Sequence, residues 1–351
     1  DGIEHFKKLM YWELELESLE DPSMLAVFET QMQEANVQFA KFIEVNYQNW
    51  IQEDDGPILS HKAFQEFVLP EIKTHQPSLL IMIDNLRFDQ WRTVLPEIKE
   101  YCKIESEKTY FSILPTATQY ARNAFFGGFT PLELSQKYPQ WWKNDIDEGG
   151  KNLHEFEFLQ AQCKRLGINR AVSYHKITQI QQSQQLIKNL QNHMHEGLTT
   201  VVYNFVDMIS HAKTEMEVIR ELAPDNKAYR SLTASWFKNS SLKELIKKGA
   251  NLGFQILLTT DHGTINVGFP SEVIGDKETS MNLRYKSGKS LTYEAKNVIS
   301  CKSPESFRLP SFYGLNSSYI FAKKDTYFVY KNKFNHYAKL YDDTFQHGWV
   351  T

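Results

Sequence analysis

Residues 78–84 read Ser-Leu-Leu-Ile-Met-Ile-Asp, a continuous apolar run that ends in an aspartate. Residues 200–207 read Thr-Val-Val-Tyr-Asn-Phe-Val-Asp, and residues 254–261 read Phe-Gln-Ile-Leu-Leu-Thr-Thr-Asp. Apolar and polar residues do not alternate in these runs, which is typical of strands buried on both faces of a parallel sheet. The three runs therefore predict an α/β fold in which a mostly parallel sheet is sandwiched by helices.

The helices that cover such a sheet are expected between the strands. Amphipathic stretches occur at residues 152–166, 179–197 and 229–249. Residues 265–318 are rich in Ser, Lys and Gly and have a weaker pattern, which predicts loops and short strands near the functional site.

The segment before the first strand has a helical pattern. Asp21 and Pro22 indicate a helix start, because Asp caps free backbone amides and Pro fits the first helical position. An apolar stripe at spacings of three and four follows, at Leu25, Phe28, Met32, Ala35, Phe39 and Phe42. Such a stripe indicates either a helix that docks on a neighbouring domain or a dimerising coiled coil. We predict a helical linker at residues 1–76 and a catalytic domain at residues 77–351.

The composition excludes several classes of protein. Lys and Arg number 39 and Asp and Glu number 43, giving a formal charge of −4, which argues against a strongly basic nucleic-acid-binding protein. A hydrophobic content of 41% excludes general disorder, and the apolar runs are too short for a membrane span. The three cysteines, Cys102, Cys163 and Cys301, form no CxxC pair, and no signal peptide is present, so we expect a reducing compartment, the cytoplasm. Because the chain begins at Asp1, we expect it to be excised from a longer protein.

Each of the three predicted strands ends in an aspartate: Asp84, Asp207 and Asp261. Ligands of parallel sheets bind beyond the carboxyl ends of the strands, so these carboxylates are expected to converge. Converging carboxylates repel one another unless cations neutralise them, which predicts a metal site.

Two histidines strengthen the case for a metal site. Asp207 and His211 are four residues apart, so a helical turn would place them on one face. Asp261 is followed directly by His262 and then by Gly263, which allows a tight turn. Asp and neutral His are ligands that suit Zn²⁺, with Mn²⁺ as the alternative.

Residues 114–123 read Leu-Pro-Thr-Ala-Thr-Gln-Tyr-Ala-Arg-Asn, a pattern that predicts a strand, a turn and a helix. Thr118 would lie at the helix N-terminus, where backbone amides favour an anion, and Arg122 would share its helical face. Because metal coordination lowers the pKa of a hydroxyl group, a threonine here is a candidate nucleophile. Thr116 is the alternative nucleophile, although a threonine at the strand end is also a typical cap.

In this order, the motifs resemble the alkaline phosphatase superfamily: an aspartate after the first strand, Pro-Thr-x-Thr, DxxxH, DHG and a late His-Gly. The phrases IMIDNLRFDQW, ILPTATQYARNAFFGG, YNFVDMISHAKTEM and LTTDHGT are similar to the PglZ domain of PorX-type response regulators in particular. The resemblance runs from about residue 78 onward. The preceding helices resemble that family's linker, and the family's receiver domain has no counterpart in this chain.

The resemblance implies two zinc ions with separate ligand sets. One zinc ion would be held by Asp207, His211 and His347, and the other by Asp84, Asp261, His262 and the oxygen of Thr118. The family's late motif continues with a second glycine, whereas this chain has Trp349 after Gly348. His336 is the alternative to His347, although it lies in a helix-like stretch.

The resemblance also implies an activity and partners. It implies hydrolysis of phosphodiesters such as oligonucleotides or cyclic nucleotides, with Thr118 as nucleophile and with Arg122 and Asn123 holding the non-bridging oxygens. It implies a receiver domain, a signalling partner, a link to type IX secretion, and a homodimer formed through the receiver or the helical segment. A sulfatase is disfavoured because Thr replaces Cys or Ser, and phosphomutase relatives commonly use Ser. A binding module with little or no turnover is the alternative from a different class.

Overall fold

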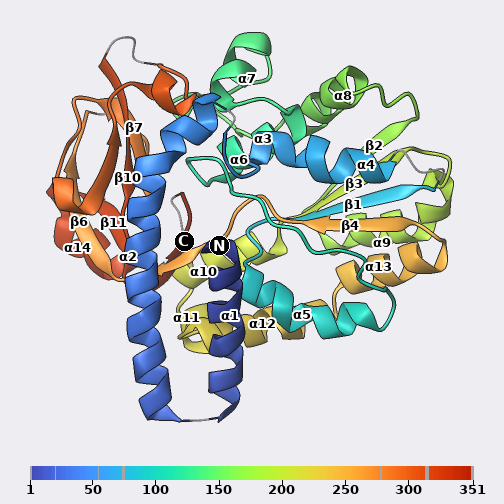
Figure 1. Ribbon diagram of the computed structural model, residues 1–351, viewed down its shortest axis with the longest axis horizontal. Coiled ribbons are helices and arrows are strands. Elements are labelled where there is room, and N and C mark those ends of the chain that lie inside the picture. The colour runs from blue at the N-terminus through green and yellow to red at the C-terminus, as the bar shows by residue number, and fades with distance from the viewer. Residues whose placement is uncertain are drawn as a thin grey trace.

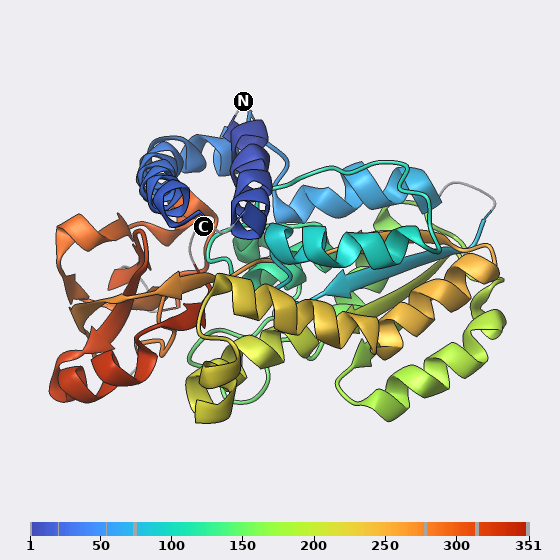
Figure 2. The same ribbon diagram turned by 90° about the horizontal axis from the view of Figure 1, so that it is seen from below.

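The computed structural model describes residues 2–19, 21–53, 55–72, 76–276, 279–312 and 316–348. Figures 1 and 2 show a helix-covered sheet on one side, a lobe of short strands on the other, and a long N-terminal helix crossing beside the two. The α-helices of the first half are α1 (Gly2–Leu19), α2 (Pro22–Glu53), α3 (Ser60–Ala63), α4 (Leu69–Ile72), α5 (Phe88–Lys99), α6 (Thr118–Gly127), α7 (Pro131–Lys137) and α8 (Glu155–Arg165). Those of the second half are α9 (Ile180–Asn189), α10 (Phe205–Glu215), α11 (Glu217–Leu222), α12 (Asn226–Lys238), α13 (Ser241–Asn251) and α14 (Phe334–Tyr341).

The strands form one parallel sheet and several small sheets. The strands of the parallel sheet are β1 (Ser78–Ile83), β2 (Val172–Ile177), β3 (Leu198–Tyr203) and β4 (Gln255–Thr259). The remaining strands are β5 (Ile265–Val267), β6 (Phe269–Ile274), β7 (Tyr285–Lys289), β8 (Thr292–Tyr293), β9 (Val298–Cys301), β10 (Ser317–Ala322), β11 (Thr326–Tyr330) and β12 (Thr344–Gln346).

The main sheet has the strand order β2-β3-β1-β4, and all three neighbouring pairs are parallel. Successive side chains of β1 point to opposite faces of the sheet. Leu80 and Met82 join the core on the side of α6 and α8, whereas Leu79, Ile81 and Ile83 join the core on the side of α5, α9 and α13. Helices therefore cover both faces, which confirms the predicted α/β sandwich (Figure 1).

The apolar runs at residues 78–84, 200–207 and 254–261 overlap β1, β3 and β4, with one difference. β3 ends at Tyr203, and Asp207 lies in the first turn of α10. A fourth strand, β2, was not predicted, because its sequence Val-Ser-Tyr-His-Lys-Ile is mostly half-buried at the edge of the sheet and lacks a continuous apolar run.

Residues 265–346 build the second lobe. Its strands form the sheets β7-β10-β9, β11-β6-β8 and β12-β5. β5 follows closely after residues 261–263 and pairs antiparallel with β12, with Gln346 opposite Ile265. This pairing brings the segment around residue 347 back to the carboxyl end of β4.

The N-terminal segment is a hairpin of two long helices, α1 and α2 (Figure 1). Asp21 caps α2, since its side chain accepts hydrogen bonds from the backbone N–H groups of Ser23 at 3.0 Å and Met24 at 3.2 Å. The Phe39 ring lies 5.9 Å from the ring of Phe111 and packs against the main core, so the apolar stripe docks on the rest of the chain.

Across the described ranges, none of the helices combines the length and apolar character that crossing a membrane requires.

Candidate active site

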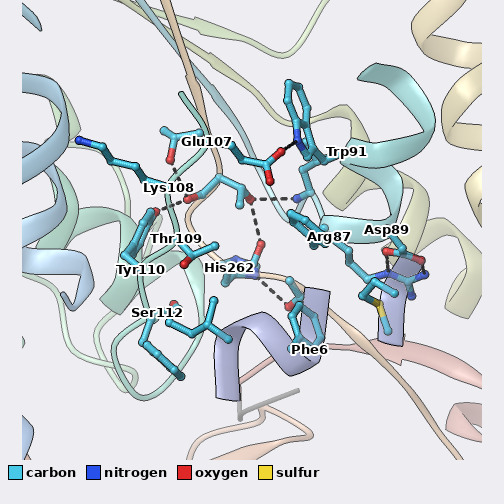
Figure 3. A pocket seen from close by; sticks show the side chains of 18 of the residues that line it. Phe6, Arg87, Asp89, Trp91, Glu107, Lys108, Thr109, Tyr110, Ser112 and His262 are labelled. Carbon is cyan, nitrogen blue, oxygen red and sulfur yellow. Dashed lines mark hydrogen bonds and ion pairs between the residues drawn. The ribbon is translucent and has the colours of Figure 1, made fainter. Parts of the chain in front are cut away.

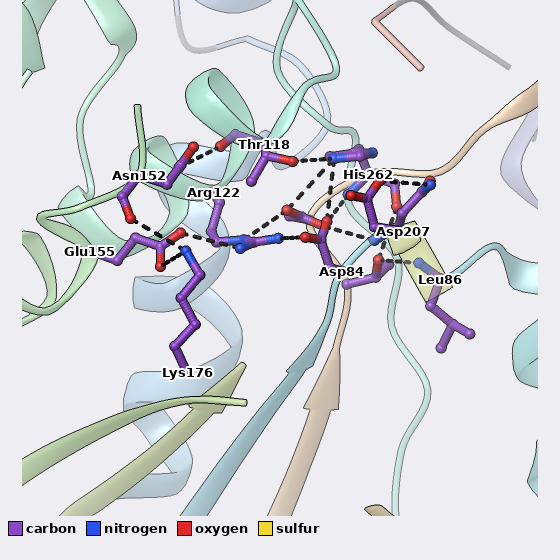
Figure 4. Close-up of polar contacts among 12 residues, drawn as sticks. Asp84, Leu86, Thr118, Arg122, Asn152, Glu155, Lys176, Asp207 and His262 are labelled. Atoms are coloured by element: carbon purple, nitrogen blue, oxygen red, sulfur yellow. Dashed lines mark hydrogen bonds and ion pairs between the residues drawn. The ribbon is translucent and has the colours of Figure 1, made fainter. Parts of the chain in front are cut away.

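Acidic and imidazole side chains gather beyond the carboxyl ends of β1 and β4 and at the start of α10. Two groups form there, and in each group the potential ligand atoms lie within 4.8 Å of one another. The inner cluster is Asp84, Asp261 and His262, and the outer cluster is Asp207, His211 and His347. The structure thus brings together the six Asp and His residues that the sequence predicts as ligands. Figure 4 labels three of them, Asp84, Asp207 and His262.

The inner cluster is almost fully buried. Nε2 of His262 lies 3.6 Å from Oδ1 of Asp84 and 3.8 Å from Oδ2 of Asp261. Asp84 directly follows β1, and Asp261 lies two residues after β4. Because these two strands are neighbours in parallel, their ends meet at one edge and place the carboxylates together.

The outer cluster is closer to the surface. Nε2 of His211 lies 3.4 Å from Oδ2 of Asp207, one helical turn away on α10. His347 follows β12, and its ring centroid lies 6.1 Å from that of His211 and 4.5 Å from that of His262. His336 lies elsewhere, exposed on α14 beside Tyr337. The geometry therefore favours His347 over His336 as the third member.

The electrostatics of the clusters follow from burial and close charges. Burial raises the pKa of Asp84 to about 7, with Arg122 opposing the rise and the carboxylates of Asp261 and Asp207 adding to it. A hydrogen bond from His211 and nearby imidazoles outweigh burial and lower the pKa of Asp207. Burial lowers the pKa of His347 to about 3, so this ring is neutral at pH 7. Neutral imidazoles beside carboxylates are the form that divalent cations bind.

Unsatisfied polar atoms in both clusters also fit metal ions. Oδ1 of Asp84 and Nδ1 of His347 are buried and have no hydrogen-bond partner among the residues that the structure describes. A buried polar atom without a partner is costly, and a coordinated cation would remove that cost. The donor set of carboxylate oxygens and imidazole nitrogens suits zinc, with manganese as the alternative.

The two candidate nucleophiles differ in their contacts. Thr118 is the first residue of α6 and is half-buried, and its Oγ1 lies 3.0 Å from Nε2 of His262. Thr116 is buried, and its Oγ1 accepts a hydrogen bond from the backbone N–H of Gly348 at 3.2 Å. Thr116 does not cap α6, because the N-cap residue is Ala117 and no side chain bonds there. A helix cap is therefore the wrong expectation for Thr116, whose hydroxyl instead binds the backbone of Gly348, next to His347.

Arg122 differs from the expectation that it holds a phosphate group. Its side chain has no solvent exposure, and its guanidinium contacts three carboxylates. Nη2 pairs with Asp84, Nε lies 2.9 Å from Asp261, and Nη1 lies 3.2 Å from Glu155. The reason is that the shared face of α6 points toward the sheet, so Arg122 lies beneath the inner cluster and fixes its carboxylates (Figure 4).

Asn123 is likewise buried and bonded within the protein. Its Nδ2 donates to the carbonyl of Lys151 at 3.3 Å, and its Oδ1 accepts from Asn152 at 3.3 Å. Asn152 also donates to the carbonyl of Thr118 at 3.0 Å. Asn123 therefore supports the backbone of the candidate nucleophile, and a contact with phosphate stays a prediction.

Asn85 is a site residue that the sequence did not reveal. Its backbone N–H donates to Oδ1 of Asp261 at 3.2 Å, and its Nδ2 donates to Oδ1 of Asp207 at 3.3 Å. It thus bridges the inner and outer clusters. Its φ of 63° is left-handed, a conformation that Asn tolerates better than most residues. The only signal in the sequence is its position directly after Asp84.

A cleft of about 3030 Å³ opens between the N-terminal hairpin and the main sheet and reaches the inner cluster. Figure 3 shows His262 among the lining side chains, together with Phe6, Trp91 and Tyr110. Residues of α1 and α2 form part of the cleft wall. The helical segment therefore helps to shape a space that borders Asp261 and His262 of the inner cluster.

Comparisons with known proteins agree with this geometry. The family model described as the BREX system PglZ alkaline phosphatase-like domain matches residues 63–351, and that of the PorX response regulator linker domain matches residues 1–51. The chain is also similar to the solved structures of murine and human ectonucleotide pyrophosphatase/phosphodiesterase 5. The sequence identities are 14% and 13%, and in each case the TM-score is 0.51 over 78% of this chain and 84% of the other. No curated protein matches. At this identity the solved structures show a shared fold.

Proposed function

Since the chain belongs to the family of PglZ alkaline phosphatase-like domains and carries a PorX-type linker, we propose that it is a two-zinc phosphodiesterase with Thr118 as its nucleophile. The observation that carries this proposal is the position of Thr118, whose Oγ1 lies 3.0 Å from a member of the inner cluster. The outer cluster lies beside it, because the rings of His262 and His347 are 4.5 Å apart.

The residues present suggest how the zinc ions would be held. Asp84, Asp261 and His262 would bind one ion and Asp207, His211 and His347 the other. Bound zinc lowers the pKa of hydroxyl groups and water and neutralises charge that develops on phosphate oxygens. Arg122 and Asn85 keep the carboxylates in place, as their contacts with Asp84 and Asp261 indicate.

The proposed reaction has two displacements. In the first, Oγ1 of Thr118 loses its proton and forms a bond to phosphorus, the bond to the leaving oxygen breaks, and the leaving group takes up that proton and becomes an alcohol. In the second, water attacks the phosphorus, the bond to Oγ1 breaks, Oγ1 takes up a proton from the water, and a phosphate monoester is released. The N-terminus of α6 favours the anionic group throughout, since free backbone amides point toward it.

The proposed substrates are oligonucleotides or cyclic nucleotides. The cleft supports this class, because aromatic side chains such as Phe6, Trp91 and Tyr110 line it and can stack on bases. The name of the similar solved structures, a nucleotide pyrophosphatase/phosphodiesterase, agrees with the same class.

The test combines metal content with turnover. The chain purified without added metal is expected to hold about two zinc ions per molecule by elemental analysis. It is also expected to hydrolyse a chromogenic phosphodiester such as bis-p-nitrophenyl phosphate. A folded chain with zinc content near zero and no turnover after zinc is supplied would contradict the proposal.

The linker match favours a signalling role as well. We propose that the catalytic domain, residues 77–351, is the output domain of a response regulator whose receiver acts through residues 1–76. The alternative is a module that binds a nucleotide or protein with little turnover, and it predicts bound zinc without hydrolysis. A homodimer, a cytoplasmic location and a link to type IX secretion stay predictions.

A further inference from the structure

A buried ionic network connects α1 to the rest of the protein at one arginine of α12. Arg230 is 2% exposed. Its Nη1 donates to Oε1 of Glu13 at 3.0 Å, and its Nη2 donates to Glu17. Glu13 and Glu17 are one turn apart on α1, so the guanidinium is held by one face of that helix. The same Nη1 also donates to Oδ2 of Asp89, at the start of α5, at 2.7 Å.

Asp89 extends the network to Arg87, which lies in the loop that follows Asp84. Its Oδ2 lies 2.5 Å from Nη2 of Arg87 and its Oδ1 accepts from Nε of Arg87 at 2.9 Å. One carboxylate is therefore shared by two guanidinium groups. Burial would raise the pKa of Asp89, but Arg87 and Arg230 outweigh burial and lower the pKa to about 2.

Arg87 lies close in the chain to one cluster residue and contacts a neighbour of another. It lies three residues after Asp84. The centre of its guanidinium lies 5.3 Å from the ring of Tyr229 and 5.2 Å from the ring of Phe345, which is two residues before His347. Arg87, which Asp89 and Asn226 orient, thus lies between the segment that follows Asp84 and the segment that precedes His347 (Figure 3 shows Arg87 and Asp89).

The balance of charge in the network depends on α1, which supplies two of its carboxylates. Arg87 and Arg230 are cationic, and Asp89, Glu13 and Glu17 are anionic partners. Without Glu13 and Glu17, Arg230 would keep Asp89 as its one carboxylate partner within the described network, and it would compete with Arg87 for Oδ2. A buried pair that loses one partner is strongly destabilised, so Asp89 would be drawn toward Arg230 and its hold on Arg87 would weaken.

We propose that Arg230 is a positioning residue that couples the docking of α1 to the geometry of both metal clusters, so that the linker controls the active site through Asp89 and Arg87. The coupling rests on the proposed function for its zinc-affinity and activity measurements, whereas its exchange measurements do not depend on it. A linker whose movement withdraws Glu13 and Glu17 would loosen the Asp84 and His347 segments together.

The test compares two double variants of the whole chain. E13Q/E17Q removes both partners of Arg230 on α1 while keeping the size of the side chains. E4Q/E15Q is the matched control, because it removes the same charge from exposed positions of the same helix. Hydrogen–deuterium exchange, zinc affinity by chelator competition, and kcat and KM for a chromogenic phosphodiester are measured for each.

For E13Q/E17Q we expect faster exchange in α1 and also in peptides that contain residues 85–91 and 344–348. We expect zinc affinity to fall by about tenfold at most, the lower end of the range for loss of a residue that hydrogen-bonds to a ligand, because Glu13 and Glu17 act through Arg230 and Asp89. The value of kcat should fall while KM stays within about twofold, since the change affects the reacting geometry rather than the cleft. E4Q/E15Q should match the unaltered chain in each measurement.

The coupling is overturned if α1 exchanges faster in E13Q/E17Q while residues 85–91, residues 344–348 and the zinc affinity stay unchanged. It is also overturned if α1 itself does not respond, or if the control variant gives the same changes. A chain that hydrolyses no phosphodiester contradicts the proposed function instead. The exchange measurements still decide the coupling in that case, because they need no substrate.

Discussion

At the scale of single residues, Thr118 and Thr116 differ in what their hydroxyl groups contact. We expect Thr118→Ala to keep the fold and both zinc ions and to lose phosphodiesterase turnover by orders of magnitude, because it removes the nucleophile. Thr116→Ala should lose about 1–3 kcal/mol of stability, since the buried N–H of Gly348 loses its acceptor. Zinc content, urea unfolding and turnover distinguish the two variants.

Added zinc provides the control for this pair. Thr116→Ala should lose part of its turnover without added zinc and regain much of it with excess zinc, because the segment that carries His347 is displaced and not removed. Thr118→Ala should regain none. The reverse pattern would identify Thr116 as the nucleophile and leave the two clusters unchanged.

The low pKa of Asp89 predicts how the stability of the protein depends on pH. Its pKa is about 2 in the folded chain, below its ordinary value near 4, so the folded state binds its proton less readily than the unfolded state. Its contribution to stability is therefore present above about pH 4 and is lost as the pH falls toward 2. This contribution to the free energy of unfolding is about 2 kcal/mol.

We expect Asp89→Asn to be less stable than the unaltered chain at pH 7 and to lose this part of the pH dependence. Urea unfolding followed by tryptophan fluorescence at pH 7, 4 and 3, with a chelator present in both samples, measures the difference. Equal slopes between pH 4 and 3 for the two chains would show that Asp89 is not the titrating group.

The sequence predicts which residues meet at the site better than it predicts where their side chains point. Asp84, Asp207 and Asp261 could be found because strand ends and one helical turn place them at a shared edge. Arg122 could not be oriented, because the spacing of four from Thr118 gives a shared helical face but not what that face packs against. Burial beneath Asp84 depends on the packing of α6 on the sheet, which no local pattern contains.

At the scale of elements, α2 supports the loop that leads to Thr118. The hydroxyl of Tyr47 is buried and accepts a hydrogen bond from the backbone N–H of Leu114 at 2.8 Å. We expect Tyr47→Phe to lower the free energy of unfolding by about 1–3 kcal/mol, because a buried N–H loses its acceptor. Turnover should fall as well, since the loop before Thr118 becomes less fixed.

Tyr11→Phe is the matched control, because Tyr11 is 50% exposed on α1. Chemical unfolding and kcat are measured for both variants. If Tyr47→Phe behaves like Tyr11→Phe, α2 stabilises the loop through apolar contacts and the hydrogen bond from Leu114 to Tyr47 contributes nothing measurable.

The continuous apolar strands could be predicted, and the irregular segments could not. β1 and β3 are buried on both faces and therefore have a distinct composition, and β4, although half-buried at the sheet edge, still has a continuous apolar run. Residues 102–110 run along the cleft without regular secondary structure, and contacts such as the bond from Trp91 to Glu107 hold them. Contacts of this kind, between residues far apart in the chain, produce no periodic pattern in the sequence.

At the scale of the whole molecule, the two clusters join segments from most of the chain. Zinc that binds only the folded form should therefore stabilise the entire fold, by about 2.7 kcal/mol per site at a hundredfold excess over its Kd. We expect saturating zinc to raise Tm by about 5–10 °C over the chelator-treated chain. Thermal unfolding by fluorescence gives the value.

His211→Ala is the informative variant here. It removes one group of the outer cluster and leaves the inner cluster intact, so about half of the shift should remain. An unchanged Tm on zinc addition in the unaltered chain would contradict metal binding by the folded protein.

The distribution of the six ligands along the chain also orders events during synthesis. Asp84 leaves the ribosome early, Asp207 to His262 follow, and His347 emerges last. A nascent chain that has passed residue 262 already holds all three side chains of the inner cluster, but only two of the three in the outer one. If zinc binds as proposed, the outer cluster gains its full set of ligands only once β12 has paired with β5. The outer cluster is therefore completed only after residue 347 has been translated, and we expect no hydrolysis by shorter nascent chains.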